Sequence, residues 1–367
     1  MRVCMDPIPY VDLRVTDPAL EEELLDAVRQ VFRHGKFVMG PEVEALEAQL
    51  AEYTGARYAV GVNSGTDALI FALRAYGVGP GDEVITVSHS FVATSSAIAI
   101  TGARPVFVDI DRRTMLLDPW LLESALTPRT AAVLPVHLNG YPCAMDEIAA
   151  FCERHGLALI EDCAQAIGCR YRGKKHVGTF GAGCFSLHPL KILAAAGDAG
   201  FITTDEADVA RQARFMRNLG LRDRDHCEIA CSNSRLDTIQ AAILLVKMRH
   251  FESWIARRNQ HAEAYRQALK NRVELPPEHD GHEPVYSSFV IRHPERDRLM
   301  AGLKQRGVSV KIHYPVPIHR QPAFADFDMP RLPATNQTVD QIISLPVHQS
   351  MTDDMRDRVI EAVLELT

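Results

Sequence analysis

The stretch Tyr58-Ala59-Val60-Gly61-Val62-Asn63-Ser64-Gly65-Thr66-Asp67-Ala68-Leu69 decides the fold. An apolar run typical of a buried strand ends at Val62, and the apolar positions of a helix begin directly after Gly65. A helix N-terminus presents free N–H groups and a positive dipole end, and glycine lets a ligand approach the backbone closely. The segment is therefore a candidate phosphate-binding turn, although a capped turn without a ligand has the same pattern. Its spacing matches neither a dinucleotide fingerprint nor a Walker A loop, which disfavours NAD and ATP.

The same alternation of short apolar runs and helical patterns continues on both sides of this stretch. Helices are expected after Asp17-Pro18 and after Pro41. Further strands are expected over residues 83–87, 105–108, 131–136, 157–160, 184–187 and 201–203. Strands that alternate with helices form a mostly parallel sheet covered on both faces, so the predicted fold class is α/β.

The pattern changes after Gly220. A long amphipathic helix is expected over 236–270, and it is followed by short strands over 285–291 and 308–313 and by helices over 296–305 and 352–366. The chain has 367 residues, whereas single cores stop growing at roughly 250 to 300 residues. We therefore expect a large domain at 1–245 and a smaller α+β domain at 246–367.

The composition narrows the class of protein. Lys and Arg number 40 and Asp and Glu 47, which gives a net charge of −7 without a long block of like charge. A basic cluster over 257–272 follows a helical pattern and indicates a solvated face, not a nucleic-acid surface. The eight cysteines include no Cys-x-x-Cys pair, so free thiols are expected, without a metal site or disulfide scaffold. Residues 1–20 lack the apolar core of a signal peptide, and no apolar run reaches the ~18 residues of a membrane span. A cytoplasmic protein is expected.

Reactive groups follow several of the predicted strands. Lys191 lies among leucine, isoleucine and alanine, where its ammonium form is poorly solvated and its free amine can act as a nucleophile. Ser186 lies in the predicted strand that precedes Lys191. Glu161 and Asp162 end another strand, and only one of them can face a given ligand because adjacent strand residues point to opposite faces. Gln165 lies one turn later.

Phe91 follows a third strand and could stack on a planar ring. Each group taken alone has an ordinary alternative, such as a surface lysine, a helix-capping carboxylate or a core aromatic. Together they offer an amine, a carboxylate, a phosphate-binding turn and an aromatic plate. Pyridoxal 5'-phosphate (PLP) has an aldehyde, a pyridine nitrogen, a phosphate and an aromatic ring, and it uses all four groups.

Two longer motifs are Ile160-Glu161-Asp162-Cys163-Ala164-Gln165-Ala166 and Ser186-Leu187-His188-Pro189-Leu190-Lys191. With these motifs and with residues 35–40, 63–69, 81–85, 91–94, 105–111, 233–237, 313–315 and 344–348, the chain resembles the DegT-type (DegT/DnrJ/StrS) family. These are PLP-dependent nucleotide-sugar aminotransferases of the aspartate-aminotransferase superfamily. The resemblance implies a fold type I, PLP-binding large domain and a smaller C-terminal domain. It also implies a homodimer with shared sites, a keto-sugar nucleotide as acceptor, and L-glutamate as the expected amino donor.

The resemblance assigns roles to individual residues. It implies that Lys191 forms the Schiff base with the cofactor, that Asp162 pairs with the pyridine nitrogen, and that Gln165 lies near the ring hydroxyl. The other implied cofactor-binding residues are Gly65, Thr66 and Ser186 at the phosphate, Phe91 on the ring, and Asn233, which reaches the phosphate of the partner subunit. His313, Tyr314 and His319 lie in a proline-rich stretch and are not assigned to the site.

Some positions depart from the family pattern. Leu187 stands where phenylalanine is frequent, residues 194–196 replace a more polar segment, and Cys231-Ser232 precede Asn233 where glycine and an aromatic are usual. The particular sugar therefore stays open. Two alternatives are a sugar dehydratase of the same family, in which histidine replaces the lysine, and a regulatory protein that keeps fold and cofactor. The presence of Lys191 disfavours the first, and the intact set of cofactor residues disfavours the second.

Overall fold

The computed structural model describes residues 6–278, 280–325, 327 and 330–367. Residues 1–5 of the amino-terminal stretch, with the expected free thiol Cys4, lie outside the described residues. The seven described cysteines form no disulfide bond. No helix of the described part is long and apolar enough to cross a membrane.

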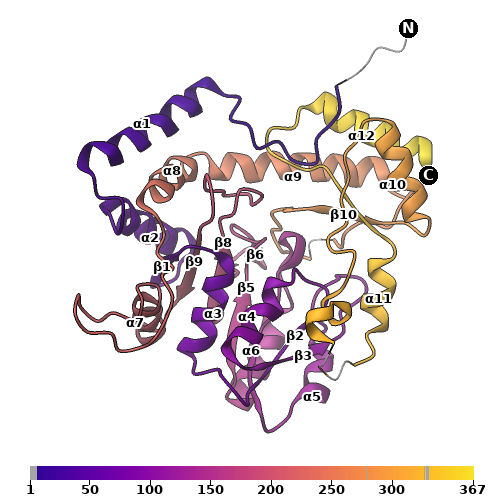
Figure 1. Ribbon diagram of the computed structural model, residues 1–367. Coiled ribbons are helices and arrows are strands. Elements are labelled where there is room, and N and C mark those ends of the chain that lie inside the picture. The colour runs from indigo at the N-terminus through magenta and orange to yellow at the C-terminus, as the bar shows by residue number, and fades with distance from the viewer. Residues whose placement is uncertain (1–5, 279, 326, 328–329) are drawn as a thin grey trace.

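A seven-stranded sheet with the order β1-β9-β8-β5-β4-β2-β3 lies at the centre of the molecule (Figure 1). Its strands are β1 (Tyr58–Val62), β2 (Glu83–Val87), β3 (Arg104–Val108), β4 (Thr130–Val133), β5 (Ala158–Asp162), β8 (Ala182–Ser186) and β9 (Gly200–Thr204). β9 runs antiparallel to both of its neighbours, and the other strands run parallel to one another. The prediction of a mostly parallel α/β sheet is confirmed.

Helices cover both faces of this sheet. They are α2 (Pro41–Thr54), α3 (Gly65–Ala75), α4 (Ala93–Thr101), α5 (Leu122–Ala125), α6 (Met145–His155), α7 (Ala207–Met216) and α8 (Thr238–Met248), while α1 (Pro18–His34) packs against α8. Because side chains alternate along a strand, Cys184 and Ile202 join the core that contains α3. Phe185 and Phe201 point to the other face, where they stack with ring centroids 4.3 Å apart in a core shared with α2 and α8.

The second half of the chain contains α9 (Phe251–Leu269), β10 (Phe289–Arg292), α10 (Arg296–Gln305), α11 (Pro333–Val339), β11 (Ile342–Leu345) and α12 (Asp353–Leu366). β10 and β11 form an antiparallel pair. In Figure 1, α9, α10 and α12 gather on one side of the central sheet. The amino-terminal segment joins this half, since Ile8 N donates to Gly307 O at 2.8 Å and Ser309 N donates to Ile8 O at 3.0 Å.

Local sequence signals account for most element ends. Asp17 caps α1 by accepting from Ala19 N at 2.9 Å, Pro18 is the first helical residue, and Gly35 ends the helix in the left-handed region with φ 71°. A short hairpin, β6 (Arg170–Tyr171) with β7 (Lys175–His176), was not expected. Short 3₁₀ turns lie at Pro119–Leu121, Leu138–Gly140, Ile318–Arg320 and Pro322–Phe324.

Two predictions in the second half were wrong. The helix expected over 236–270 is two helices, α8 and α9, because the chain turns at Arg249 and His250. The strand expected over 308–313 is not a strand: Val308 and Lys311 form only isolated bridges, one with Ile8 and one with Ser344. Neither partner is close in sequence, so local alternation could not reveal this arrangement. The domain boundary near residue 245 stays a prediction.

Candidate active site

A cavity of about 840 Å³ lies where the carboxyl ends of β1, β2, β5 and β8 meet loops of the second half. Seven of the residues predicted from sequence line it: Gly65, Thr66, Phe91, Asp162, Gln165, Ser186 and Lys191. Asn233 does not line it; this residue is exposed and forms an isolated bridge with Asn218. The cavity therefore gathers predicted residues from Gly65 to Lys191, and its whole lining extends from Pro9 to His348.

Asp162 ends β5 and is 5 % exposed as a residue. Thr94 Oγ1 donates to its Oδ2 at 2.8 Å, and Ala164 N donates to its Oδ1 at 3.1 Å. Burial raises the pKa of Asp162, while these two hydrogen bonds and the charge of Lys191 act in the opposite direction. The side chain is thus held in one orientation by fixed donors.

Lys191 lies in a loop between β8 and β9 and is half-buried. Burial lowers the pKa of its amine, and the negative charge of Asp162 partly opposes the shift. Helix α8 holds the following residues, because Lys247 Nζ donates to Ala194 O at 2.6 Å and Gln240 Oε1 accepts from Ala196 N at 2.8 Å. The amine is thereby presented to the cavity by a loop with fixed ends.

The predicted phosphate-binding turn packs tightly against the sheet. Ser64 caps α3 by accepting from Asp67 N at 3.1 Å. A Cβ at Gly65 would lie 2.7 Å from Ser186 Cβ, and one at Gly200 would lie 2.5 Å from the carbonyl carbon of Ser64. Only glycine fits at both positions. The first N–H groups of α3 and the hydroxyls of Thr66 and Ser186 are consequently neighbours at one end of the cavity.

Phe91 and Gln165 both approach Tyr314. The rings of Phe91 and Tyr314 have centroids 5.5 Å apart, and the Phe91 side chain is 53 % exposed. Gln165 Nε2 donates to Tyr314 Oη at 3.0 Å, and Gln165 Oε1 accepts from Asn139 N at 2.7 Å. These contacts fix the amide and connect the sheet to the second half of the chain.

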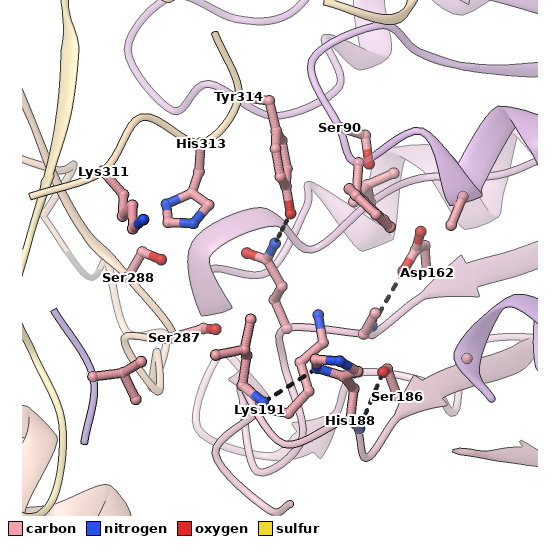
Figure 2. Close-up of a pocket in the computed structure, with 18 of the residues that line it drawn as sticks. Ser90, Asp162, Ser186, His188, Lys191, Ser287, Ser288, Lys311, His313 and Tyr314 are labelled. Carbon is pink, nitrogen blue, oxygen red and sulfur yellow. Dashed lines mark hydrogen bonds between the residues drawn. The ribbon is translucent and has the colours of Figure 1, made fainter. Parts of the chain in front are cut away.

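Sequence reasoning missed the opposite wall of the cavity. Figure 2 shows Ser288, Lys311 and His313 across the cavity from Asp162. Tyr10 belongs to the same wall and donates from Oη to Ser288 Oγ at 3.1 Å. Burial lowers the pKa of His313 to about 4, and the charges of Lys191 and Lys311 act in the same direction. The only sequence signal for this wall was the resemblance to the family over residues 313–315, and that resemblance does not say where the side chains point.

Of the three residues that were left out of the site, His313 and Tyr314 line the cavity. His319 does not; its Nδ1 lies 2.7 Å from Ser88 Oγ, and its backbone N donates to the same oxygen at 2.9 Å. Ser88 follows β2, so this contact attaches the segment that carries His313 and Tyr314 to the central sheet.

Residues 18–364 match the DegT/DnrJ/EryC1/StrS aminotransferase family. The chain belongs to this family. The expected aminotransferase family and fold type I are thereby confirmed, and related structures of the family imply dependence on PLP or pyridoxamine phosphate.

Relatives of this DegT/DnrJ/EryC1/StrS protein cover almost its whole length. The dTDP-3-amino-3,4,6-trideoxy-alpha-D-glucose transaminase of Streptomyces venezuelae is 41% identical over 362 residues, which are 98% of this chain and 96% of the relative. A pleiotropic regulatory protein of Geobacillus stearothermophilus is 40% identical over 365 residues, 98% of each chain. The crystal structure of S. venezuelae DesV in complex with a ketimine intermediate has a TM-score of 0.95 at 40% identity and covers 98% of each chain.

Proposed function

We propose that this protein is a PLP-dependent aminotransferase that moves an amino group from an amino acid, expected to be L-glutamate, to a keto-sugar nucleotide in a ping-pong reaction. The observation that carries the proposal is the shared cavity of Lys191 and Asp162, in which burial lowers the pKa of the amine. The similarity to a dTDP-sugar transaminase supports the class of acceptor.

The groups around the cavity fit PLP. The free N–H groups at the start of α3 are suited to stabilise an anion. Because Gly65 and Gly200 have no side chain, the turn packs closely against β8 and β9. Asp162 supplies the negative charge that a protonated pyridine nitrogen requires. Phe91 supplies an aromatic face for the ring.

When bound, PLP supplies an electron sink for the charge that develops at Cα of the amino donor. Lys191 then acts as the base that accepts the Cα proton at Nζ and returns it during the transfer. Its lowered pKa keeps more of the free amine available near neutral pH. Thr94 and Ala164 hold the Asp162 carboxylate in place through their hydrogen bonds.

The proposal extends to a cytoplasmic homodimer. Asn233 is exposed outside its own cavity, as a residue that reaches the partner's phosphate would be. Phe32, Phe37 and Val38 are exposed apolar side chains, of the kind that a partner subunit covers. Free cysteines in the described residues suit a reducing compartment. We place the boundary between the PLP-binding domain and the smaller domain near residue 245.

The test separates the two half-reactions. Purified protein is loaded with PLP and mixed with L-glutamate, and formation of the 2-oxo acid is measured; a panel of keto-sugar nucleotides is then added. We expect 2-oxoglutarate first and an aminosugar nucleotide second. A protein that binds PLP but consumes no amino donor would support the regulatory alternative. A deoxysugar in the mass spectrum of the product would support the dehydratase.

A further inference from the structure

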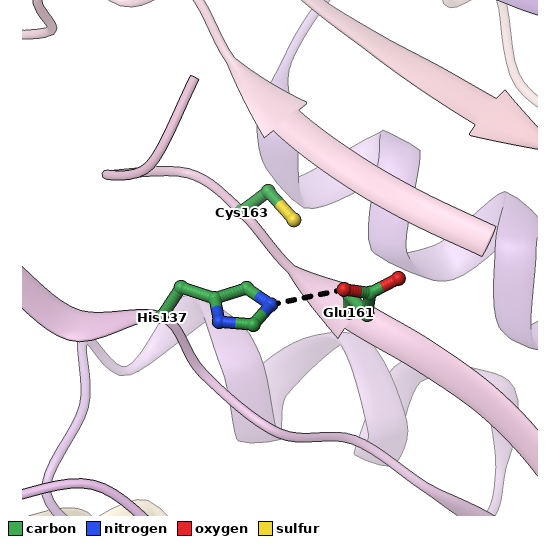
Figure 3. Close-up of side chains that lie close together, drawn as sticks. All are labelled: His137, Glu161 and Cys163. Carbon is green, nitrogen blue, oxygen red and sulfur yellow. Dashed lines mark hydrogen bonds and ion pairs between the residues drawn. The ribbon is translucent and has the colours of Figure 1, made fainter. Parts of the chain in front are cut away.

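His137, Glu161 and Cys163 form a buried cluster (Figure 3), and Glu161 and Cys163 flank Asp162 in the sequence. One ligand atom from each residue lies within 4.8 Å of the others, and the side chains of His137 and Glu161 are fully buried. Histidine, carboxylate and thiol are common zinc ligands. The hydrogen bonds around these atoms decide whether the cluster can bind a metal.

Glu161 has both of its carboxylate oxygens occupied. Four donors point at them: His137 Nε2 at 3.1 Å, Gly178 N at 2.8 Å, Phe180 N at 2.8 Å and Gly181 N at 3.2 Å. Buried carboxylates require such compensation, and here backbone and imidazole donors provide it. A metal ion at this carboxylate would have to displace these four donors.

His137 is also occupied at both ring nitrogens. Cys143 N donates to Nδ1 at 3.0 Å, so Nδ1 carries a lone pair and the proton resides on Nε2, which donates to Glu161. Burial raises the pKa of the Cys163 thiol well above its ordinary range, which disfavours a thiolate ligand. His137, Glu161 and the backbone donors around them therefore form a closed hydrogen-bonded unit, which we interpret as structural and not as a metal site.

This unit holds the backbone on both sides of Asp162, whose carboxylate is predicted to bind the cofactor. The backbone N of His137 donates to Asp162 O at 3.0 Å, and Asp162 N donates to Pro135 O at 2.9 Å. The residues 178–181 that donate to Glu161 lead directly into β8, the strand that ends at Ser186. One buried carboxylate thus holds the strand that presents Asp162 and the entry to the strand that precedes Lys191.

We propose that His137 and Glu161 are positioning residues for the PLP site: they fix the ends of β5 and β8 so that Asp162 faces the pyridine nitrogen while Ser186 and Lys191 face the rest of the cofactor. The inference rests on the proposed PLP-dependent function. Neither residue lines the cavity, so neither touches a bound cofactor directly. Their effect is exerted through the backbone of Asp162 and through the turn before β8.

The test compares His137→Phe, which removes both hydrogen bonds of the ring, with His137→Gln, whose amide can donate to Glu161. The affinity of the apoprotein for PLP, the pH dependence of the visible absorption of the bound cofactor, and the thermal unfolding of the apoprotein are measured. We expect His137→Phe to weaken PLP binding by about 10-fold, the scale that follows from losing one buried hydrogen bond that holds the site. We also expect His137→Phe to shift the pH dependence of the absorption and to lower kcat with little change in KM for the amino donor. His137→Gln should restore most of the PLP affinity, the absorption profile and kcat.

A His137→Phe protein that unfolds at lower temperature but keeps wild-type PLP affinity and absorption would overturn the proposal, because the role would then be structural only. Stoichiometric metal in the wild type that is lost from the variant would overturn it as well. If His137→Phe does not fold, His137→Asn, whose amide is too short to reach Glu161, is compared with His137→Gln in the same assays. A wild-type protein that binds no PLP would instead refute the proposed function.

Discussion

The two sides of the cavity are built differently. The sheet side, made of Gly65, Thr66, Asp162, Ser186 and Lys191, lies on strand ends, one helix start and one loop held by α8. The loop side, made of Tyr10, Ser288, Lys311, His313 and Tyr314, comes from irregular segments of the amino-terminal stretch and the second half. We propose from this difference that the chemistry belongs to the sheet side and the choice of substrate to the loop side.

The largest expected effect comes from removing the amine of the sheet side. Lys191→Met should reduce transamination by at least about 10⁴-fold, since both the nucleophile and the proton-transfer group are lost. The control is Lys304→Met, a lysine on the exposed face of α10 that does not line the cavity. Steady-state rates with glutamate measure both. Similar losses in the two variants would show that Lys191 has no special role.

Asp162→Asn should have the second-largest effect on transamination. The substitution keeps the shape and the contact with Thr94 but removes the charge offered to the pyridine nitrogen, so kcat should fall by about 10²- to 10³-fold while PLP still binds. Single-turnover rates and cofactor absorption are the measurements. Wild-type turnover would mean that another group on the sheet side supplies this charge.

Gly65→Ala should weaken cofactor binding more than it lowers the catalytic rate. The new Cβ would lie 2.7 Å from Ser186 Cβ, so the turn must move, and overpacking of about 1–3 kcal/mol predicts roughly a 10-fold rise in the Kd for PLP. Gly79→Ala is the control, because its Cβ would meet only Thr101 O at an ordinary 3.8 Å. Equal affinity in the Gly65 variant and the wild type would remove this turn from the phosphate site.

On the loop side, Tyr314→Phe should have the smallest effect. It removes one hydrogen bond from Gln165, worth about 1 kcal/mol, and keeps the ring against Phe91, so kcat/KM should fall about 5-fold. We expect the change mainly in the half-reaction with the sugar nucleotide. A loss as large as that of Asp162→Asn would show that the chemistry is not confined to the sheet side.

The sheet side could be predicted because its signals are local. The strand from Tyr58 to Val62 and the helix that begins at Gly65 were located from apolar periodicity and the glycine. Alternation along β5 required Glu161 and Asp162 to face opposite ways, and the structure places only Asp162 on the cavity. The family resemblance had selected the same residue.

The loop side could not be predicted because its contacts are remote in sequence. Ile8 pairs with Val308, and this pairing brings Tyr10 to the cavity; no periodicity in either segment indicates it. His313 and Tyr314 lie in irregular chain, where side-chain direction depends on the anchoring of the segment at Ser88. The buried contact of His137 with Glu161 is likewise invisible to local pattern.

In the proposed function, Lys191 is the amine to which the cofactor becomes attached. The most direct test is to load the wild-type protein with PLP, reduce it with borohydride, digest it and map the modified peptide by mass spectrometry. We expect a pyridoxyl phosphate group on Lys191. A group attached to Lys311, which also lines the cavity, or no attached group in a protein that binds PLP, would contradict it.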